Sequence, residues 1–241
     1  MNKTGDTKKA ETAVRTDKYP HSDNDWENFD VLHINRLPSA ATFMAYTTKE
    51  KAVKNDKSQS EYFQSLNGTW KFQFVPRSDQ RPMDFFEKGH DVSGWGNIKV
   101  PANWEMEGYG HPFYVGAGYG IKRNPPLIAV ENSPVGSYKR TFNVPANWKG
   151  KQIVLHFGGV ASAFYVWVNG EKVGYSQDSK TPSEFDITPY AVTGQNEIAV
   201  QVFKFSDGYY LEDQDYWRFA GIQRDVYLYA RPQTHIRDFE V

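Results

Sequence analysis

The stretch from Ser206 to Val226 holds the residue types in this chain that are best suited to chemistry. It reads S-D-G-Y-Y-L-E-D-Q-D-Y-W-R-F-A-G-I-Q-R-D-V and lies between two segments with strand-like patterns. Its carboxylates offer oxygen ligands to a cation or to sugar hydroxyls, and its aromatic rings offer faces to sugar C–H groups. These residues are Asp207, Glu212, Asp213 and Asp215, with Tyr209, Tyr210, Tyr216 and Trp217. The alternative interpretation is an acidic surface loop without a ligand.

Strands are the elements that must position this loop, because apolar and polar residues alternate through most of the chain. Asn169-Gly170 lies between two such runs and is a strong hairpin signal. The predicted strands are 70–74, 138–144, 152–157, 164–168, 171–175, 196–205 and 225–229. Helical spacing occurs only around 58–66, where Asn67-Gly68 ends it. Several short strands at this spacing predict an all-β sandwich.

Three ranges follow from these patterns. Residues 1–25 are polar and charged, with too little apolar surface to offset the entropy of ordering, so they are predicted to be a flexible tail. Residues 26–231 are predicted to form the sandwich. In 232–241, Ile236, Phe239 and Val241 are spaced like the start of a further strand. That last range is therefore interpreted as the beginning of a following domain.

Composition excludes several classes of protein. The 241 residues carry a net charge of −1, which gives no electrostatic footprint for nucleic acid or for an anionic membrane. There is no Cys, so disulfides, thiolate metal sites and cysteine nucleophiles are all excluded. No apolar run is long enough to span a bilayer, and a soluble protein of the cytoplasm or periplasm is expected. The glycine-rich stretch 108–120 precedes no helix with Lys-Ser or Lys-Thr, so it does not predict a phosphate loop.

Other candidate residues have structural interpretations. Trp95, Trp104 and Trp167 form either a sugar-stacking platform or part of the core, and the core is favoured for Trp167 because it lies within a strand. His156 is interpreted as a satisfied sheet residue, and the histidines show no zinc spacing. Arg218 and Arg224 are expected to hold the acidic loop in place.

Several motifs, in order along the chain, carry a family resemblance. They are W-E-N at Trp26, L-N-G-T-W-K-F at Leu66, V-P-A-N-W-E-M-E-G-Y-G at Val100, N-P-P at Asn124, G-Y-S-Q-D-S-K-T-P-S-E-F-D at Gly174 and S-D-G-Y-Y-L-E-D-Q-D-Y-W-R at Ser206. Together they resemble the N-terminal domain of glycoside hydrolase family 2 β-galactosidases. The resemblance implies a jelly-roll β-sandwich of the galactose-binding-domain-like type. It also implies that an immunoglobulin-like domain and a catalytic (β/α)₈ barrel follow in the complete enzyme.

The resemblance implies a retaining mechanism in that enzyme, with an acid/base carboxylate and a nucleophilic carboxylate about 5 Å apart. In this family both are glutamates of the barrel, so neither Glu184 nor Glu212 is assigned a catalytic role. The chain by itself is therefore expected to lack hydrolytic activity. Its implied partners are a terminal β-galactoside, the remaining domains of the enzyme and a second copy in a homo-oligomer.

The resemblance also implies roles for individual residues of this chain. Asp215 matches the family aspartate that contacts the galactose 6-hydroxyl and an adjacent monovalent cation, Na⁺ or K⁺. The alternative for Asp215 is a capping or salt-bridging role near Arg218 or Arg224. The loop from Tyr114 to Tyr119 matches the segment that approaches the non-galactose part of the substrate. Gly116 departs from the family asparagine there, so the hydrogen bond from that side chain is lost and the preference for the aglycone does not carry over.

A divalent site is also implied by the resemblance. Asp25, Asn28, the carbonyl of Val31, Gln177 and Asp207 match positions that hold Mg²⁺ or Ca²⁺, and carboxylate, amide and carbonyl oxygens suit both ions. The alternative is that Asp25 and Asn28 cap a turn while Gln177 pairs with backbone.

Two alternatives to a domain that completes an active site remain open. A free-standing carbohydrate-binding module should bind galactosides by itself, whereas a domain that makes only part of the sugar contacts should bind them poorly. A structural interface domain would keep the fold and make Asp215 dispensable.

Overall fold

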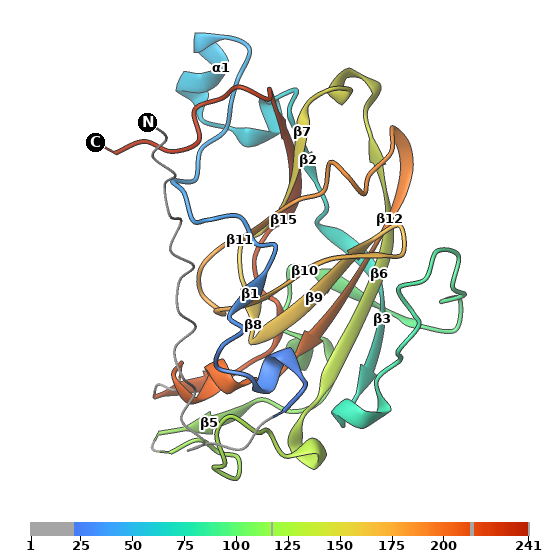
Figure 1. The fold of residues 1–241 in the computed structure, drawn as a ribbon, viewed down its shortest axis with the longest axis vertical. Coiled ribbons are helices and arrows are strands. Elements are labelled where there is room, and N and C mark those ends of the chain that lie inside the picture. Colours follow the sequence, from blue (N-terminus) through green and yellow to red (C-terminus); the bar gives the residue numbers. More distant parts are fainter. Residues whose placement is uncertain (1–21, 117, 213–214, 241) are drawn as a thin grey trace, which may run out of the picture.

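The computed structural model describes residues 22–116, 118–212 and 215–240, which form a β-sandwich of two antiparallel sheets (Figure 1). In spatial order the larger sheet is β1-β10-β9-β12-β6-β3-β4 and the smaller sheet is β11-β7-β15-β2. The predicted all-β sandwich is therefore confirmed. The tail predicted for 1–25 falls mostly on residues outside those described, as do Asp213 and Val241.

The strands of the larger sheet are β1 (His33–Ile34), β3 (Gly68–Val75), β4 (Gly96–Val100), β6 (Val135–Val144), β9 (Ala163–Val168), β10 (Glu171–Gln177) and β12 (Gly194–Phe203). Those of the smaller sheet are β2 (Phe63–Ser65), β7 (Gln152–Phe157), β11 (Ser183–Asp186) and β15 (Val226–Arg231). Two short ribbons pair β5 (Phe113–Val115) with β13 (Tyr216–Arg218) and β8 (Val160–Ala161) with β14 (Gly221–Ile222). The α-helix is α1 (Lys49–Lys54), and the short 3₁₀ turns are η1 (Asp25–Glu27), η2 (Lys57–Gln59), η3 (Ser78–Gln80), η4 (Trp104–Glu107), η5 (Val130–Asn132), η6 (Ala146–Trp148) and η7 (Asp207–Tyr210).

The main core lies between the two sheets and is built by the predicted alternation. Trp70 and Phe72 from β3 are buried together with Phe157 from β7 and Leu228 from β15. Removing such large apolar surfaces from water is the main stabilising contribution to a sandwich.

A second buried cluster covers the other face of the larger sheet. It contains Trp26, Tyr165, Trp167 and Phe203, with Trp26 stacked on Phe203 at 4.1 Å between ring centroids. The rings of Trp167 and Phe86 are stacked and nearly parallel. Trp167 is therefore a packing residue, as predicted, and its ring face is not open to a sugar.

The Asn169-Gly170 hairpin is confirmed, with both residues in the left-handed region at φ 52° and 89°. Two positive φ values in a two-residue turn match the right-handed twist of the flanking strands.

The helix predicted around 58–66 is wrong. Phe63 to Ser65 form β2, which pairs with β15, and this pairing overrides the helical spacing. The α-helix lies earlier, where the Thr48 side chain caps α1 and Asn55 ends it in the left-handed conformation.

The strand predicted near the end of the chain is also absent, since residues 232–240 contain no strand. Instead Asp238 accepts a hydrogen bond from the Ala41 backbone at 2.8 Å, and Phe239 contacts Phe43 with ring centroids 5.5 Å apart. An exposed segment without a neighbouring strand edge gains little from extending. The domain boundaries themselves stay predictions.

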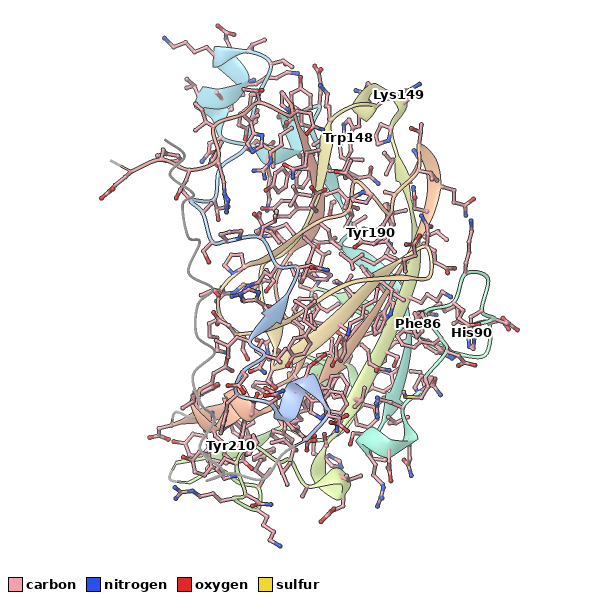
Figure 2. All side chains as sticks on the ribbon, viewed as in Figure 1. Phe86, His90, Trp148, Lys149, Tyr190 and Tyr210 are labelled. Atoms are coloured by element: carbon pink, nitrogen blue, oxygen red, sulfur yellow. The ribbon has the colours of Figure 1, made fainter. Side chains whose placement is uncertain are left out.

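No helix within 22–116, 118–212 or 215–240 is long and apolar enough to cross a membrane. Figure 1 places β5 and η7 at the same end of the sandwich, and Figure 2 labels Tyr210 of η7 there, with Trp148 at the opposite end. The acidic loop therefore lies at one end of the molecule, together with the glycine-rich segment around β5.

Candidate functional site

The ribbon of β5 and β13 positions Asp215. Trp217 pairs with Tyr114 and Arg218 pairs with Phe113 across this ribbon. Because side chains alternate along a strand, Tyr114 and Trp217 share one face, where they are 53% and 52% exposed. The Tyr114 hydroxyl donates a hydrogen bond to Asp215 Oδ1, just before β13, and this bond raises the pKa of Tyr114. An exposed carboxylate is thus held by Tyr114, beside the contacting rings of Tyr114 and Trp217.

Gly116 lies beside the same carboxylate. A Cβ atom built at Gly116 would be 3.5 Å from Asp215 Oδ1 and 3.5 Å from the Tyr114 ring, which is ordinary van der Waals contact. Asp215, Tyr114 and Gly116, taken from two distant stretches of sequence, therefore come together. Asp215 is thus hydrogen bonded to Tyr114, while Arg224 donates to the Lys180 backbone.

Glu212 anchors the acidic loop to the turn after β10. Its carboxylate accepts hydrogen bonds from Ser179, at 2.8 Å from the backbone nitrogen and 2.5 Å from the hydroxyl. Burial raises the pKa of Glu212, and the two bonds from Ser179 oppose that rise. The neighbouring Asp178 has φ 81° and closes its own turn by accepting a hydrogen bond from Thr181. Sequence reasoning missed Ser179, whose only signal was its place in the Q-D-S-K motif.

Asp207 is the centre of a second, buried cluster. Its Oδ1 atom accepts hydrogen bonds from Gln177 Nε2 at 2.6 Å and from the Gly208 backbone at 2.8 Å. Gln177 Nε2 also lies 3.3 Å from the Val31 carbonyl oxygen. Within the part of the chain that the structure describes, Asp207 Oδ2 is buried without a hydrogen-bond partner. Burial raises the pKa of Asp207 to about 6, because the charged form has lost its water.

Gly208 explains how this cluster packs so tightly. A Cβ atom at Gly208 would lie 2.6 Å from Gln177 Oε1, closer than any side chain tolerates without a shift. Glycine after Asp207 therefore lets the amide of Gln177 approach the carboxylate.

The other two predicted divalent ligands have partners of their own. Asp25 Oδ2 accepts a hydrogen bond from the Tyr165 hydroxyl at 2.7 Å and lies 3.6 Å from Lys172 Nζ. Asn28 Oδ1 accepts one from the Asp30 backbone at 3.1 Å, which is the turn-capping role considered for it. Gln177 thus contacts both Val31 and Asp207, while Asp25 and Asn28 lie in and directly after the η1 segment.

This set of donors fits a hard divalent cation better than zinc. No group of three or more His, Cys, Asp or Glu residues gathers within the described ranges. Carboxylate, amide and carbonyl oxygens are ligands that Mg²⁺ and Ca²⁺ accept, but here Gln177 turns its Nε2 atom, and not its oxygen, towards Asp207 Oδ1 and the Val31 carbonyl. Binding of an ion by all three groups would require the Gln177 amide to turn its Oε1 atom towards the site.

Glu27 is a carboxylate near this cluster that sequence reasoning did not single out. It accepts hydrogen bonds from the Ile128 backbone at 2.8 Å and from Asn24 Nδ2 at 2.9 Å, and its charge adds to the rise in the pKa of Asp207. Its oxygens are occupied, so Glu27 ties η1 to the rest of the fold. The W-E-N motif contained it but gave no sign of the contact to Ile128, which is 101 residues away.

His156 has the structural role predicted for it. Its ring lies 2.9 Å from Glu184 and stacks on Tyr227 across the smaller sheet, with centroids 4.2 Å apart. Arg218 covers the rings of Tyr216 and Tyr209, and Arg224 donates to the Lys180 backbone at 2.7 Å. Both arginines therefore help to hold the loops at this end of the molecule.

These features define a β-sandwich domain with a carboxylate-bearing loop at one end. Residues 63–232 match the family described as "Glycosyl hydrolases family 2, sugar binding domain", and the chain belongs to that family. A β-galactosidase of Priestia megaterium is 46% identical over 100% of this chain and 23% of its own length. One of Halalkalibacterium halodurans is 44% identical over 92% of this chain and 22% of its own.

Solved structures agree with the fold. β-Glucuronidase 2 of Bacteroides uniformis, covalently bound to cyclophellitol-6-carboxylate aziridine, is 27% identical with a TM-score of 0.54, covering 70% of this chain and 18% of its own. The chain therefore spans about a fifth of the length of the curated relatives that it matches. The recognition of the family from sequence motifs is confirmed.

Proposed function

We propose that this chain is the N-terminal sugar-binding domain of a β-galactosidase. In the complete protein, terminal β-galactosides would be hydrolysed by a retaining mechanism that uses two glutamates of another domain. The chain alone would not hydrolyse them. The relatives at 46% and 44% identity, both named β-galactosidase, support this proposal.

The observation that carries the proposal is the exposed Asp215 held by Tyr114. An exposed carboxylate that is fixed by a hydrogen bond at the end of the sandwich suits a contact with a substrate hydroxyl or with a monovalent cation. Asp215 would contact the galactose 6-hydroxyl and share Na⁺ or K⁺ with the other domains. Gly116, which lies beside Asp215, would approach the non-galactose part of the substrate without a side chain of its own.

Asp207, Gln177 and the Val31 carbonyl would hold Mg²⁺ or Ca²⁺ as a structural ion. The orphaned oxygen of Asp207 supports this role. The ion would balance a buried negative charge and hold the start of the acidic loop against η1. Contacts between copies of the domain would contribute to assembly of the complete enzyme.

The test of the proposal is Asp215→Ala in the complete enzyme. We expect kcat/KM for a galactoside to fall by roughly 10²- to 10³-fold, because a contact made most strongly in the transition state is removed. The melting temperature should change little, since the side chain is exposed. Steady-state kinetics and calorimetry measure both. Turnover equal to that of the wild type would exclude a role of Asp215 in the active site and leave a structural interface domain.

One observation favours a second candidate, a carbohydrate-binding module that acts by itself. Tyr114 and Trp217 are large, exposed and in contact, with ring centroids 5.8 Å apart. Exposed aromatic pairs are typical of binding surfaces. Titration calorimetry of the 241-residue chain with lactose distinguishes the two, because only the module should give a saturable signal that Trp217→Ala abolishes.

A further inference from the structure

A solvent-open hollow of about 610 Å³ lies beside β5. Its walls include Phe74, Trp104, His111, Phe113, Ile121 and Lys204. Pockets that hold small molecules commonly measure roughly 300–1,000 Å³ and combine apolar walls with a few polar groups. The hollow therefore has the size and the kind of wall of a ligand site.

Lys204 supplies a hydrogen-bond donor to this hollow. Its side chain is only 6% exposed, and its Nζ atom donates to Glu105 Oε1 at 2.6 Å and to the His111 carbonyl at 3.3 Å. An ammonium group carries three donors, and among the described residues Lys204 Nζ makes no hydrogen bond besides these two. His111 and Phe113 both line the hollow, and Nζ lies 5.1 Å from the Phe113 ring centroid. The remaining donor of Nζ therefore lies among residues that line the hollow, beside the rings of Phe113 and Phe205.

The charges around the hollow favour a neutral ligand. Glu105 is fully buried as the partner of Lys204, and its other oxygen accepts a hydrogen bond from the Ala220 backbone at 3.0 Å. The positive charge of Lys204 is therefore already balanced, while Glu131 at the exposed rim adds a negative charge. An anion would gain little from Lys204 and would be repelled by Glu131. A hydroxyl oxygen, in contrast, can accept the remaining hydrogen bond.

We propose that this hollow binds a small neutral ligand with a hydroxylated ring, the chemistry shared by a monosaccharide and a phenol. The ligand accepts a hydrogen bond from Lys204 and packs its ring against Phe74 and Phe113. Phe113 alternates with Tyr114 along β5, so the hollow lies on the opposite side of that strand from the Tyr114–Asp215 contact. The site is therefore separate from the proposed galactoside contact and does not depend on it.

The experiment is an NMR titration of the ¹⁵N-labelled 241-residue chain, with methyl β-galactoside and phenol as separate probes. We expect saturable shifts of the backbone amides of Phe113 and Ile121, with affinity in the millimolar range for at least one probe. The probe that saturates the shifts at the lower concentration shows whether the site prefers a sugar ring or a phenol ring. No saturable shift with either probe, or shifts confined to Tyr114, Asp215 and Trp217, would overturn the proposal.

Two variants and one control sharpen the test. Glu131→Trp adds a large ring at the exposed rim without touching the core, and should weaken binding at least about tenfold. Glu107→Trp, exposed on η4 and outside the hollow, is the matched control and should bind like the wild type. The double variant Glu105→Gln with Lys204→Met removes the donor without leaving an unpaired buried charge, and should also weaken binding. Wild-type affinity in Glu131→Trp overturns the proposal, whether or not the double variant folds.

Discussion

Asp207 and Asp215 belong to one short stretch of sequence yet occupy opposite environments. Asp207 is 1% exposed, keeps one oxygen without a partner within the described residues, and has its pKa raised to about 6 by burial. Asp215 is exposed and hydrogen bonded to Tyr114 at the edge of the molecule. The fold thus places two identical side chains in two different environments. One carboxyl group is buried and keeps an oxygen unpaired among the described residues, and the other is exposed to solvent.

In the isolated chain, the largest effect that tests this contrast is the dependence of the free energy of unfolding on pH. The folded pKa of Asp207, about 6, lies above its ordinary value of 3.8, so its contribution to stability is complete below about pH 4 and is lost as the pH rises through 6. Without divalent ions, this loss should reach about 2–3 kcal/mol by pH 7.5. Urea denaturation in EDTA across this range measures it. Asp207→Asn should remove this pH-dependent contribution, whereas an unchanged pH profile in Asp207→Asn would contradict the burial argument.

Addition of a cation should reverse the same loss. Mg²⁺ or Ca²⁺ at a hundredfold excess over its Kd should stabilise the folded chain by about 2.7 kcal/mol at pH 7.5, because the ion binds only the folded state. The response should shrink towards pH 5, where the proton on Asp207 competes with the metal. Thermal denaturation with EDTA and with millimolar cation is the measurement. Asp215→Asn is the matched control and should respond like the wild type, while Asp207→Asn should not respond.

The link between Glu212 and Ser179 should have a smaller effect. Ser179→Ala removes the hydroxyl donor to a buried carboxylate and should cost about 1–2 kcal/mol of the free energy of unfolding. Hydrogen exchange in the loop around Leu211 should accelerate more than in β12, because the loop loses its anchor. Mass spectrometry after proteolysis measures this difference. Equal acceleration throughout the sandwich would mean that Ser179 supports the whole fold and not the loop.

Tyr114→Phe should have the smallest effect. The hydrogen bond to Asp215 is exposed, so its loss should leave the melting temperature of the chain unchanged within about 1 °C. In the complete enzyme the same change should lower kcat/KM by roughly three- to tenfold, because Asp215 loses its orientation. A loss as large as that in Asp215→Ala would show that Tyr114 contacts the substrate itself.

The sequence predicted best those features that local rules determine. Asn169-Gly170 specified its hairpin because a two-residue turn needs only its own backbone freedom. The helix prediction for residues 58–66 was wrong for the opposite reason. Its strand forms only because β15, far away in sequence, offers an edge at which Phe63 to Ser65 can pair.

The candidate site shows the same difference between features set by local sequence and features set by distant contacts. Periodicity did not predict that Tyr114 would meet Asp215, and only the resemblance to a known family placed both in one site. Ser179 with Glu212, and Lys204 with Glu105, escaped prediction because each pair joins segments that no motif connects. A buried ion pair separated by 99 residues has no local signature, since either partner alone resembles an ordinary surface charge.

The pairing of β5 with β13 has a consequence for the order in which the chain folds. Tyr114 and Asp215 are 101 residues apart, and most of the sandwich strands lie between them in sequence. Contacts over such separations close late, after the intervening strands have already reduced the entropy of the loop. The ribbon should therefore form after the β9–β10 hairpin and the other strand pairs that lie between Tyr114 and Asp215 in sequence. Correct placement of Asp215 thus depends on prior pairing of β6, β9, β10 and β12.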